Sequence, residues 1–422
     1  MSTRLAATLA GSRTARDAAK RRARGFTLVE LMASLAGGMA LAVTVFLLAK
    51  HTSSLYQRET RAASATLGSV VGFERLRADI ARAGFMASPN IRRDPFVCGS
   101  PSSGSWPALL GSLSSIWIQD TPSSSLPAFF ADNHIAPQQI IMAGNYSSAE
   151  AFPIRAVYAQ TNVFVVSLQV ATGPLSRIGY NSTGADKQAI LDAAFPAGRA
   201  VRIVDKSGRH HYATLQSTAI SPDPTLTLKG SAPALTFRGS STSGCGLTGE
   251  ETGAMINTVN FIRYSLVNLS SDANYKPIFD TQGPSYDANR VELVRDELDP
   301  TGAAISGTRE LIAEYAVDLR FRLTVAPSQR TALQYVQGAA VAQWAGDPAT
   351  LSAGKGPQLV REVQTWLSVR SREADRTSGV TLTSDGPVYR VGLGSGGTTP
   401  FARVRSVQAR IALQNQIGVT WQ

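Results

Sequence analysis

The chain has 422 residues, 43 % of them hydrophobic, and a formal net charge of +11. This length allows a large core and more than one lobe. Residues 1–25 hold seven basic residues and one acidic residue, so the remainder carries only about +5, which does not by itself indicate a nucleic-acid-binding protein.

The first predicted element is a helix that opens with a long apolar run. Phe26 to Ala49 are 24 residues with a single charged side chain, Glu30. At about 1.5 Å per residue such a helix is roughly 36 Å long, which is enough to cross a bilayer core of about 30 Å. Because the preceding residues 1–25 are basic, the positive-inside rule predicts that this end stays in the cytoplasm and that the rest of the chain is exported.

Glu30 and Gly25 distinguish this run from a simple anchor, which is the alternative interpretation. A carboxylate within the first apolar turns costs a few kcal/mol on insertion scales, so Glu30 suggests a partner inside the membrane. An ordinary secretory signal is cut after its apolar core, but this core is too long and no good A-x-A site follows it. A cut after Gly25 would instead leave Phe26 as the N-terminus and Glu30 as the fifth residue.

The segment Arg-Gly-Phe-Thr-Leu-Val-Glu-Leu at residues 24–31 resembles the class III signal of type IV prepilins and type II secretion pseudopilins. The resemblance implies that a prepilin peptidase cuts between Gly25 and Phe26 and methylates the Phe26 amine. It also implies that Glu30 meets the N-terminal amine of a neighbouring subunit in a helical filament. A buried carboxylate that is paired with an ammonium group can fix the register between helices.

Residues 50–83 are predicted to continue this helix beyond the membrane. Apolar side chains recur at three- and four-residue steps between charged ones, which is typical of an amphipathic helix, and Gly84 is a natural stop. The run Asp-Ile-Ala-Arg-Ala-Gly-Phe at 79–85 is similar to the helix end of the PilW-like branch of minor pilins. We therefore expect one helix over residues 26–83, with residues 26–49 in the membrane.

The rest of the chain is predicted to be rich in β-strands. Short β-branched and aromatic runs alternate with turn residues over 84–255, which we treat as a variable region. Further strand-like runs follow over 256–422, and the near-terminal pattern R-x-x-x-x-R-I-x-L-x-N at 405–415 resembles the C-terminal domain of PilW-like minor pilins. The arginines of this last strand are most simply its solvent-exposed side. The expected fold class is α+β and type IV pilin-like, with a long N-terminal helix on a large antiparallel body.

The two cysteines, Cys98 and Cys245, both follow the apolar run and so lie on the exported side. An oxidising compartment allows one intramolecular disulfide between them. The loop of 147 residues that it would close corresponds to a stabilisation of about 4–5 kcal/mol in the chain-entropy account. Two separate buried thiols are the alternative.

Signals of catalysis or of cofactor binding are weak. Residues 392–397 fit G-x-G-x-x-G, but Thr-Thr-Pro follows instead of a helix start, so we interpret them as a loop. The pair His210-His211 is a poor metal site, because adjacent residues of a strand point to opposite faces. We expect no enzyme activity, no cofactor and no metal.

The resemblance covers about half of the chain and implies a minor type IV pilin that helps to initiate pilus assembly at the tip. The implied partners are the prepilin peptidase, the other minor pilins, the major pilin, the inner membrane and a large tip adhesin. One alternative is a J-like pseudopilin of a type II secretion system. The other is a tip adhesin or DNA-binding minor pilin, which a patch of arginines on one face would favour. The candidate members of that patch are Arg370, Arg372, Arg390, Arg403, Arg405 and Arg410.

Overall fold

A computed structural model divides the chain into two compact units, residues 1–60 and residues 61–422, which are described separately. For α1 residues 54, 57–58, 61–62, 64–66 and 68 it describes the backbone alone. The described residues are 27–99, 101, 106–122, 125–160, 163–170, 173–229, 235, 245–247, 249, 252–270, 272–278, 287, 289–327, 332–372, 389–393, 400–419 and 421.

The predicted N-terminal helix is present as α1 (Leu28–Arg82), which begins in the first unit and ends in the second. Its first part, Leu28–Ser53, is 26 residues long and apolar enough to cross a membrane, and none of it is buried in the protein. In the second unit the apolar side chains of Phe73, Leu76 and Ile80 are buried, at the spacing of one helix face. The helix ends just before Gly84, whose φ of 74° is the left-handed conformation that glycine adopts without strain.

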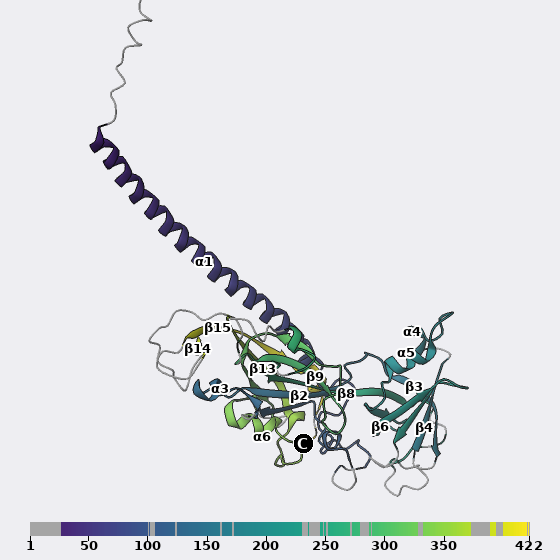
Figure 1. The fold of residues 1–422 in the computed structure, drawn as a ribbon. Helices are drawn as coiled ribbons and strands as arrows, with labels where there is room; N and C mark the ends of the chain where they lie inside the picture. Colours follow the sequence, from purple (N-terminus) through teal and green to yellow (C-terminus); the bar gives the residue numbers. More distant parts are fainter. Residues whose placement is uncertain are drawn as a thin grey trace, which may run out of the picture. The chain divides into compact units, whose positions relative to one another are not determined.

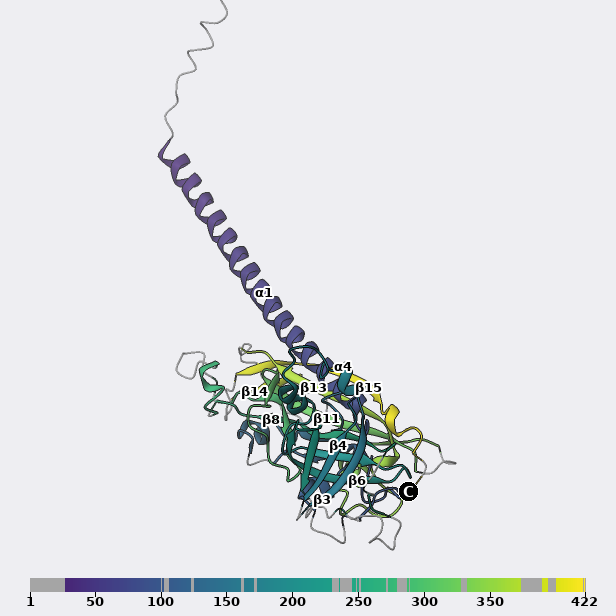
Figure 2. The ribbon, with the colours of Figure 1, turned by 90° about the vertical axis from the view of Figure 1, so that its right-hand side faces the viewer.

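One lobe of the second unit is a closed ring of antiparallel strands. The pairing order is β8–β3–β4–β7–β6–β5, and β5 pairs back onto β8, which closes the ring. Figures 1 and 2 show β3, β4 and β6 side by side in this lobe. The ring encloses its own core, which includes Phe152, Phe195 and Leu215. Its strands are β3 (Phe152–Gln160), β4 (Val163–Leu168), β5 (Ala200–Val204), β6 (His210–Ala219), β7 (Thr225–Lys229) and β8 (Met255–Val267), and α4 (Pro174–Arg177) and α5 (Lys187–Ala194) lie between β4 and β5 in the chain.

Strand β8 connects this ring to the rest of the body, as its central place in Figure 1 shows. Its first residues, Met255 to Val259, pair with β5, whereas residues 260–267 pair with β2 and β9. Beside β2 and β9 lie the outer strands β1 and β10. The bounds are β1 (Ile116–Asp120), β2 (Gln138–Gly144), β9 (Glu292–Leu298) and β10 (Glu310–Ala313).

A second, five-stranded sheet has the order β12–β11–β13–β15–β14. One of its sides is buried, through residues such as Leu319 and Phe321 of β11 and Val363 and Leu367 of β13. These side chains share one hydrophobic core with Phe73 of α1 and with residues of β1, β2, β8 and β9. The bounds are β11 (Ala316–Val325), β12 (Gln334–Val336), β13 (Val360–Arg370), β14 (Arg390–Gly392) and β15 (Phe401–Ala412), and the short helices are α2 (Ala108–Gly111), α3 (Phe129–Asp132) and α6 (Ala342–Ala345).

The fold is thus α+β, with one apolar N-terminal helix and a large antiparallel β body, as the sequence predicts at this level.

Candidate functional site

The carboxylate of Glu30 caps the first turn of α1. Its Oε2 accepts hydrogen bonds from the backbone N–H of Thr27 and from the Thr27 hydroxyl, both at 3.1 Å. The N–H of Glu30 in turn donates to Thr27 Oγ1 at 3.2 Å. This reciprocal arrangement is a capping box, and the positive end of the helix dipole favours the negative charge there as well.

The capping box is a role of Glu30 that the sequence analysis missed. Its signal was visible, because Thr27 and Glu30 have the Thr-x-x-Glu spacing directly before an apolar run. Capping gives Glu30 a function within a single chain, in which its Oε2 atom accepts hydrogen bonds from Thr27. Gly25 and Phe26, the two predicted processing residues, lie outside the described residues.

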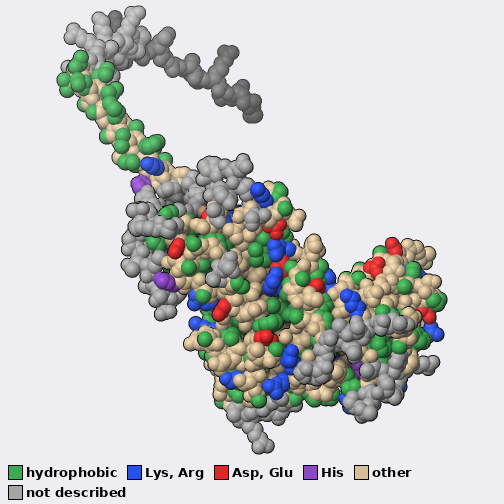
Figure 3. All heavy atoms as spheres, turned by 60° about the horizontal axis from the view of Figure 1, so that its bottom comes forward, with side chains coloured by type: hydrophobic (Ala, Val, Ile, Leu, Met, Phe, Trp, Pro, Cys, Tyr) green, Lys and Arg blue, Asp and Glu red, His purple; other side chains and the backbone are tan. Residues whose placement is uncertain are grey.

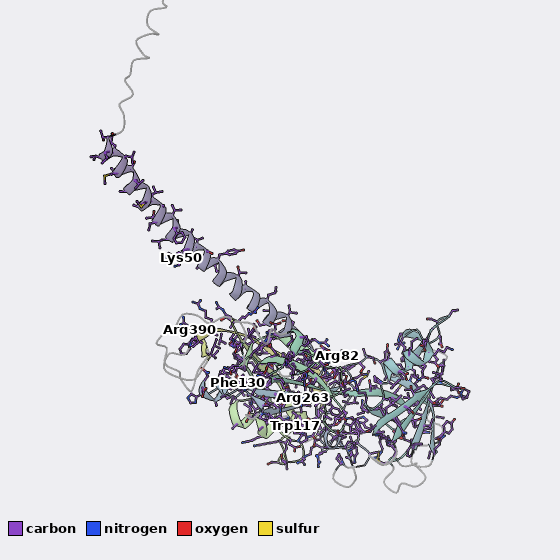
Figure 4. All side chains as sticks on the ribbon, in the orientation of Figure 1. Lys50, Arg82, Trp117, Phe130, Arg263 and Arg390 are labelled. Carbon is purple, nitrogen blue, oxygen red and sulfur yellow. A yellow bond between two sulfur atoms is a disulfide. The ribbon has the colours of Figure 1, made fainter. Side chains whose placement is uncertain are left out.

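The apolar surface of α1 is the other feature of this first unit. Leu28, Leu41 and Phe46 are 66–77 % exposed. Figure 3 shows hydrophobic side chains around this helical segment, and Figure 4 places Lys50 farther along it. Such a surface is costly in water, and the segment is long and apolar enough to cross a membrane.

In the second unit, a buried ion pair fixes the last turns of α1 to the body. Asp79 is 3 % exposed and Arg295 of β9 is 8 % exposed. Arg295 Nε donates to Asp79 Oδ2 at 2.8 Å, and the Tyr264 hydroxyl of β8 donates to the same oxygen at 2.8 Å. A second carboxylate, Glu310 of β10, accepts from Arg295 Nη1 at 2.9 Å. The buried charge of Asp79 is therefore paired and hydrogen-bonded, as a stable buried carboxylate requires.

The surroundings keep these groups in the protonation states that the ion pair needs. Burial raises the pKa of the Tyr264 hydroxyl, and the neighbouring Asp79 carboxylate raises it further, so the phenol remains a donor. Burial lowers the pKa of Arg295, but its hydrogen bond and charge interaction with Asp79 outweigh this effect and the pKa is raised. Arg295 therefore stays positively charged.

Backbone contacts hold the helix end in the same place. Gly72 lies so close to the carbonyl oxygen of Ile312 in β10 that a Cβ atom at this position would overlap it. The Arg82 guanidinium, near the body end of α1 in Figure 4, donates to the carbonyl of Asn145 at 2.8 Å. From the C-terminal segment, the Asn415 amide donates to the carbonyl of Ala83 at 3.1 Å. Segments far apart in the sequence thus define one position for the end of α1.

The predicted disulfide between Cys98 and Cys245 is present. Cys98 is tied to the β-ring as well, because its N–H donates to the carbonyl of His210 in β6 at 2.8 Å. The guanidinium of Arg209 lies 3.3 Å from Cys245 Sγ. The bridge therefore links the segment before β8 to the chain that follows α1, over a separation of 147 residues.

The six arginines of the hypothetical binding patch do not share one face. Arg370 is 1 % exposed and forms an ion pair with Asp287. Arg403, Arg405 and Arg410 are exposed on β15, but alternation along the strand places Arg410 on the side opposite to the other two. The structure therefore gives no support to that patch as a single surface.

No cluster of three or more metal-ligating side chains occurs within the residues that the structure describes. His210 and His211 face different carboxylates, Asp94 at 3.5 Å and Asp205 at 3.2 Å. Of the glycine-rich run 392–397, only the first two residues are described, and Gly392 ends the short strand β14.

No family model, curated protein or solved structure matches the chain.

Proposed function

We propose that the chain is a minor type IV pilin, cut between Gly25 and Phe26 and held in the bacterial inner membrane by α1, with its body in the periplasm. The observation that carries this proposal is the signal-like segment at residues 24–31, whose last residues begin an unburied apolar helix segment, Leu28–Ser53. A pilin needs such a helix twice, first in the membrane before assembly and then among other helices in the filament.

Assembly rests on packing and not on catalysis. The exposed apolar side chains of α1 lie against the helices of neighbouring subunits, and Glu30 neutralises the N-terminal amine of one of them. The capping box supports this role, because it orients the carboxylate at the very start of the helix. The processing partner is the prepilin peptidase, and the assembly partners are other minor pilins, the major pilin and a large tip adhesin.

The size of the body favours a special position in the filament. The second unit extends from residue 61 to residue 422 and has two lobes. A body of this size is too bulky to repeat along a thin filament, so we place the chain at the tip, where it helps to initiate assembly.

The sharpest test separates the capping role of Glu30 from its pairing role. Glu30→Gln keeps a residue that can complete a capping box but removes the charge, whereas Thr27→Val removes the capping hydroxyl and keeps the charge. Immunoblots of cell membranes and of sheared surface filaments measure processing and incorporation. We expect Glu30→Gln to be processed but absent from filaments, and Thr27→Val to be incorporated. Normal incorporation of Glu30→Gln would contradict the pairing role.

A deletion strain identifies the filament. Loss of surface pili with intact protein secretion is the expected result. Loss of secretion with normal pili would instead indicate a J-like pseudopilin.

A further inference from the structure

The side of the five-stranded sheet that faces away from the core carries an ordered set of arginine, glutamine and aromatic side chains. We call it the outer face and define it by Arg322, Tyr335, Gln364, Trp366, Gln408 and Arg410. The opposite side of the same strands is buried, so alternation leaves these side chains at the surface.

Two arginines flank a glutamine in one row across the sheet. Arg322 of β11 pairs in register with Gln364 of β13, which pairs in register with Arg410 of β15. Neighbouring strands lie about 4.8 Å apart, so the two arginine backbones are roughly 10 Å apart with an amide between them. Both guanidinium groups can therefore reach anionic groups of a single extended ligand.

Arg322 is already held in position. Its guanidinium carbon lies 4.4 Å from the centre of the Trp366 ring, and its Nη1 donates to the Tyr335 hydroxyl at 3.0 Å. That hydroxyl donates to Gln364 Oε1 at 3.0 Å. An arginine that is stacked and hydrogen-bonded in this way loses less side-chain entropy when it binds an anion.

Two carboxylates of the same sheet are engaged by residues outside this row. Asp318 pairs with Arg320 at 2.8 Å, and Glu362 accepts from Thr324 at 3.2 Å. Among the residues that the structure describes, neither Arg322 nor Arg410 has a carboxylate within ion-pair distance. The two guanidinium groups are thus available to an external anion.

We propose that the outer face binds an acidic polysaccharide. Sugar carboxylates would lie on Arg322 and Arg410, sugar hydroxyls on the amides of Gln364 and Gln408, and the apolar side of a sugar ring on Tyr335, which is 51 % exposed. This proposal rests on the proposed function in one respect, which is that the body must lie outside the cytoplasm for the outer face to meet such a ligand. The binding itself does not require a filament.

The charge pattern favours a polysaccharide over a single-stranded nucleic acid. A nucleic acid carries one phosphate per nucleotide and needs a strongly basic surface, whereas this face also holds Asp318 and Glu362. Stacking of successive bases needs several open rings, but the ring of Trp366 already has Arg322 against it. The more widely spaced charges and the hydroxyl groups of an acidic polysaccharide suit two arginines and two amides better.

The test uses the full-length protein in detergent micelles, with polygalacturonate as the probe and titration at low and high ionic strength. Uncharged dextran and a single-stranded oligonucleotide serve as comparison ligands. The test variant is Arg322→Gln/Arg410→Gln. The control Arg405→Gln makes the same substitution at one exposed arginine on the other side of β15, and Tyr335→Phe removes only the hydroxyl that holds Arg322. Circular dichroism confirms that each variant is folded.

We expect polygalacturonate to bind more weakly as salt rises, and the double variant to lose about tenfold or more in affinity, since a hydrogen bond to a charged group contributes at least this much. Arg405→Gln should bind polygalacturonate with the affinity of the wild type, and Tyr335→Phe should bind it more weakly. No binding by the wild type, equal binding by the double variant, or tighter binding of the oligonucleotide would each overturn the proposal. Because processing at Gly25 is measured separately, a failure here is distinct from a failure of the pilin proposal.

Discussion

Asp79 in α1 and Arg295 in β9 are 216 residues apart in the sequence, yet they form a 2.8 Å ion pair that is almost fully buried. The pair joins the end of the helix to the sheet that contains β8 and β9. In the proposed filament, a force on α1 would reach the body through this contact and the packing around it.

Loss of one partner of this pair should destabilise the body strongly. Asp79→Ala leaves the charge of Arg295 buried and only partly compensated, and we expect a loss of about 3–5 kcal/mol in the free energy of unfolding. Denaturant unfolding of the detergent-solubilised protein measures this. Glu74→Ala is the matched control, because Glu74 forms an exposed ion pair with Arg77 on the same helix, and its loss should cost less than about 1 kcal/mol. Equal effects of the two variants would contradict the role of the buried pair.

The close approach of α1 to β10 should make Gly72 intolerant of a side chain. In Gly72→Ala the added methyl group meets the carbonyl oxygen of Ile312, so the helix must shift, at a cost of about 1–3 kcal/mol. At Gly37, where a Cβ atom meets nothing within 4 Å, the same substitution should leave the unfolding of the body unchanged. Thermal unfolding of both variants distinguishes the two sites, and an unchanged Gly72→Ala protein would show that the helix is not held against β10.

The disulfide should supply a large part of the stability of the body. Closure of a 147-residue loop restricts the unfolded chain, and Cys98→Ser/Cys245→Ser should lower the free energy of unfolding by about 5 kcal/mol. Treatment of the wild type with a reductant should lower it by a similar amount and should have no effect on the variant. If the reductant destabilises both proteins equally, the effect does not come from this bridge.

Asp318 should make the body more stable at mildly acidic pH. Burial raises its pKa to about 6, although the charge of Arg320 opposes the shift. Because the folded state binds the proton more tightly than the unfolded state, this group contributes stability that is complete below about pH 4 and is lost as the pH rises through about 6. The difference of about two pKa units corresponds to roughly 3 kcal/mol.

Asp318→Asn should remove this contribution. Between pH 4 and pH 7, the free energy of unfolding should decrease less in Asp318→Asn than in the wild type. The substitution Asp132→Asn, at an exposed position, should leave this pH dependence unchanged. A wild-type profile in Asp318→Asn would mean that the carboxyl titrates normally.

The sequence predicted the features that depend on local pattern. The apolar run and Gly84 defined α1 closely, because helix length, periodicity and a glycine stop are encoded in neighbouring residues. The disulfide followed from having only Cys98 and Cys245 on the same side of the apolar segment.

The features that depend on long-range pairing were not predicted. The β-ring closes through β5 and β8, and no local signal specifies which strands meet. In the same way, β8 pairs with β5 and β2, which come before the boundary expected at residue 255, and with β9, which comes after it. The Asp79–Arg295 pair could not be predicted either, because no local pattern specifies a partner for Asp79 that lies 216 residues away in the sequence.

The cut between Gly25 and Phe26 is the central claim, and the intact mass of the protein from membranes tests it most directly. The measurement is made in cells with and without a prepilin peptidase. We predict a chain that begins at methylated Phe26 when the peptidase is present and a full-length chain when it is absent. A chain that keeps residues 1–25 in both strains would identify a plain signal anchor and would contradict the pilin account.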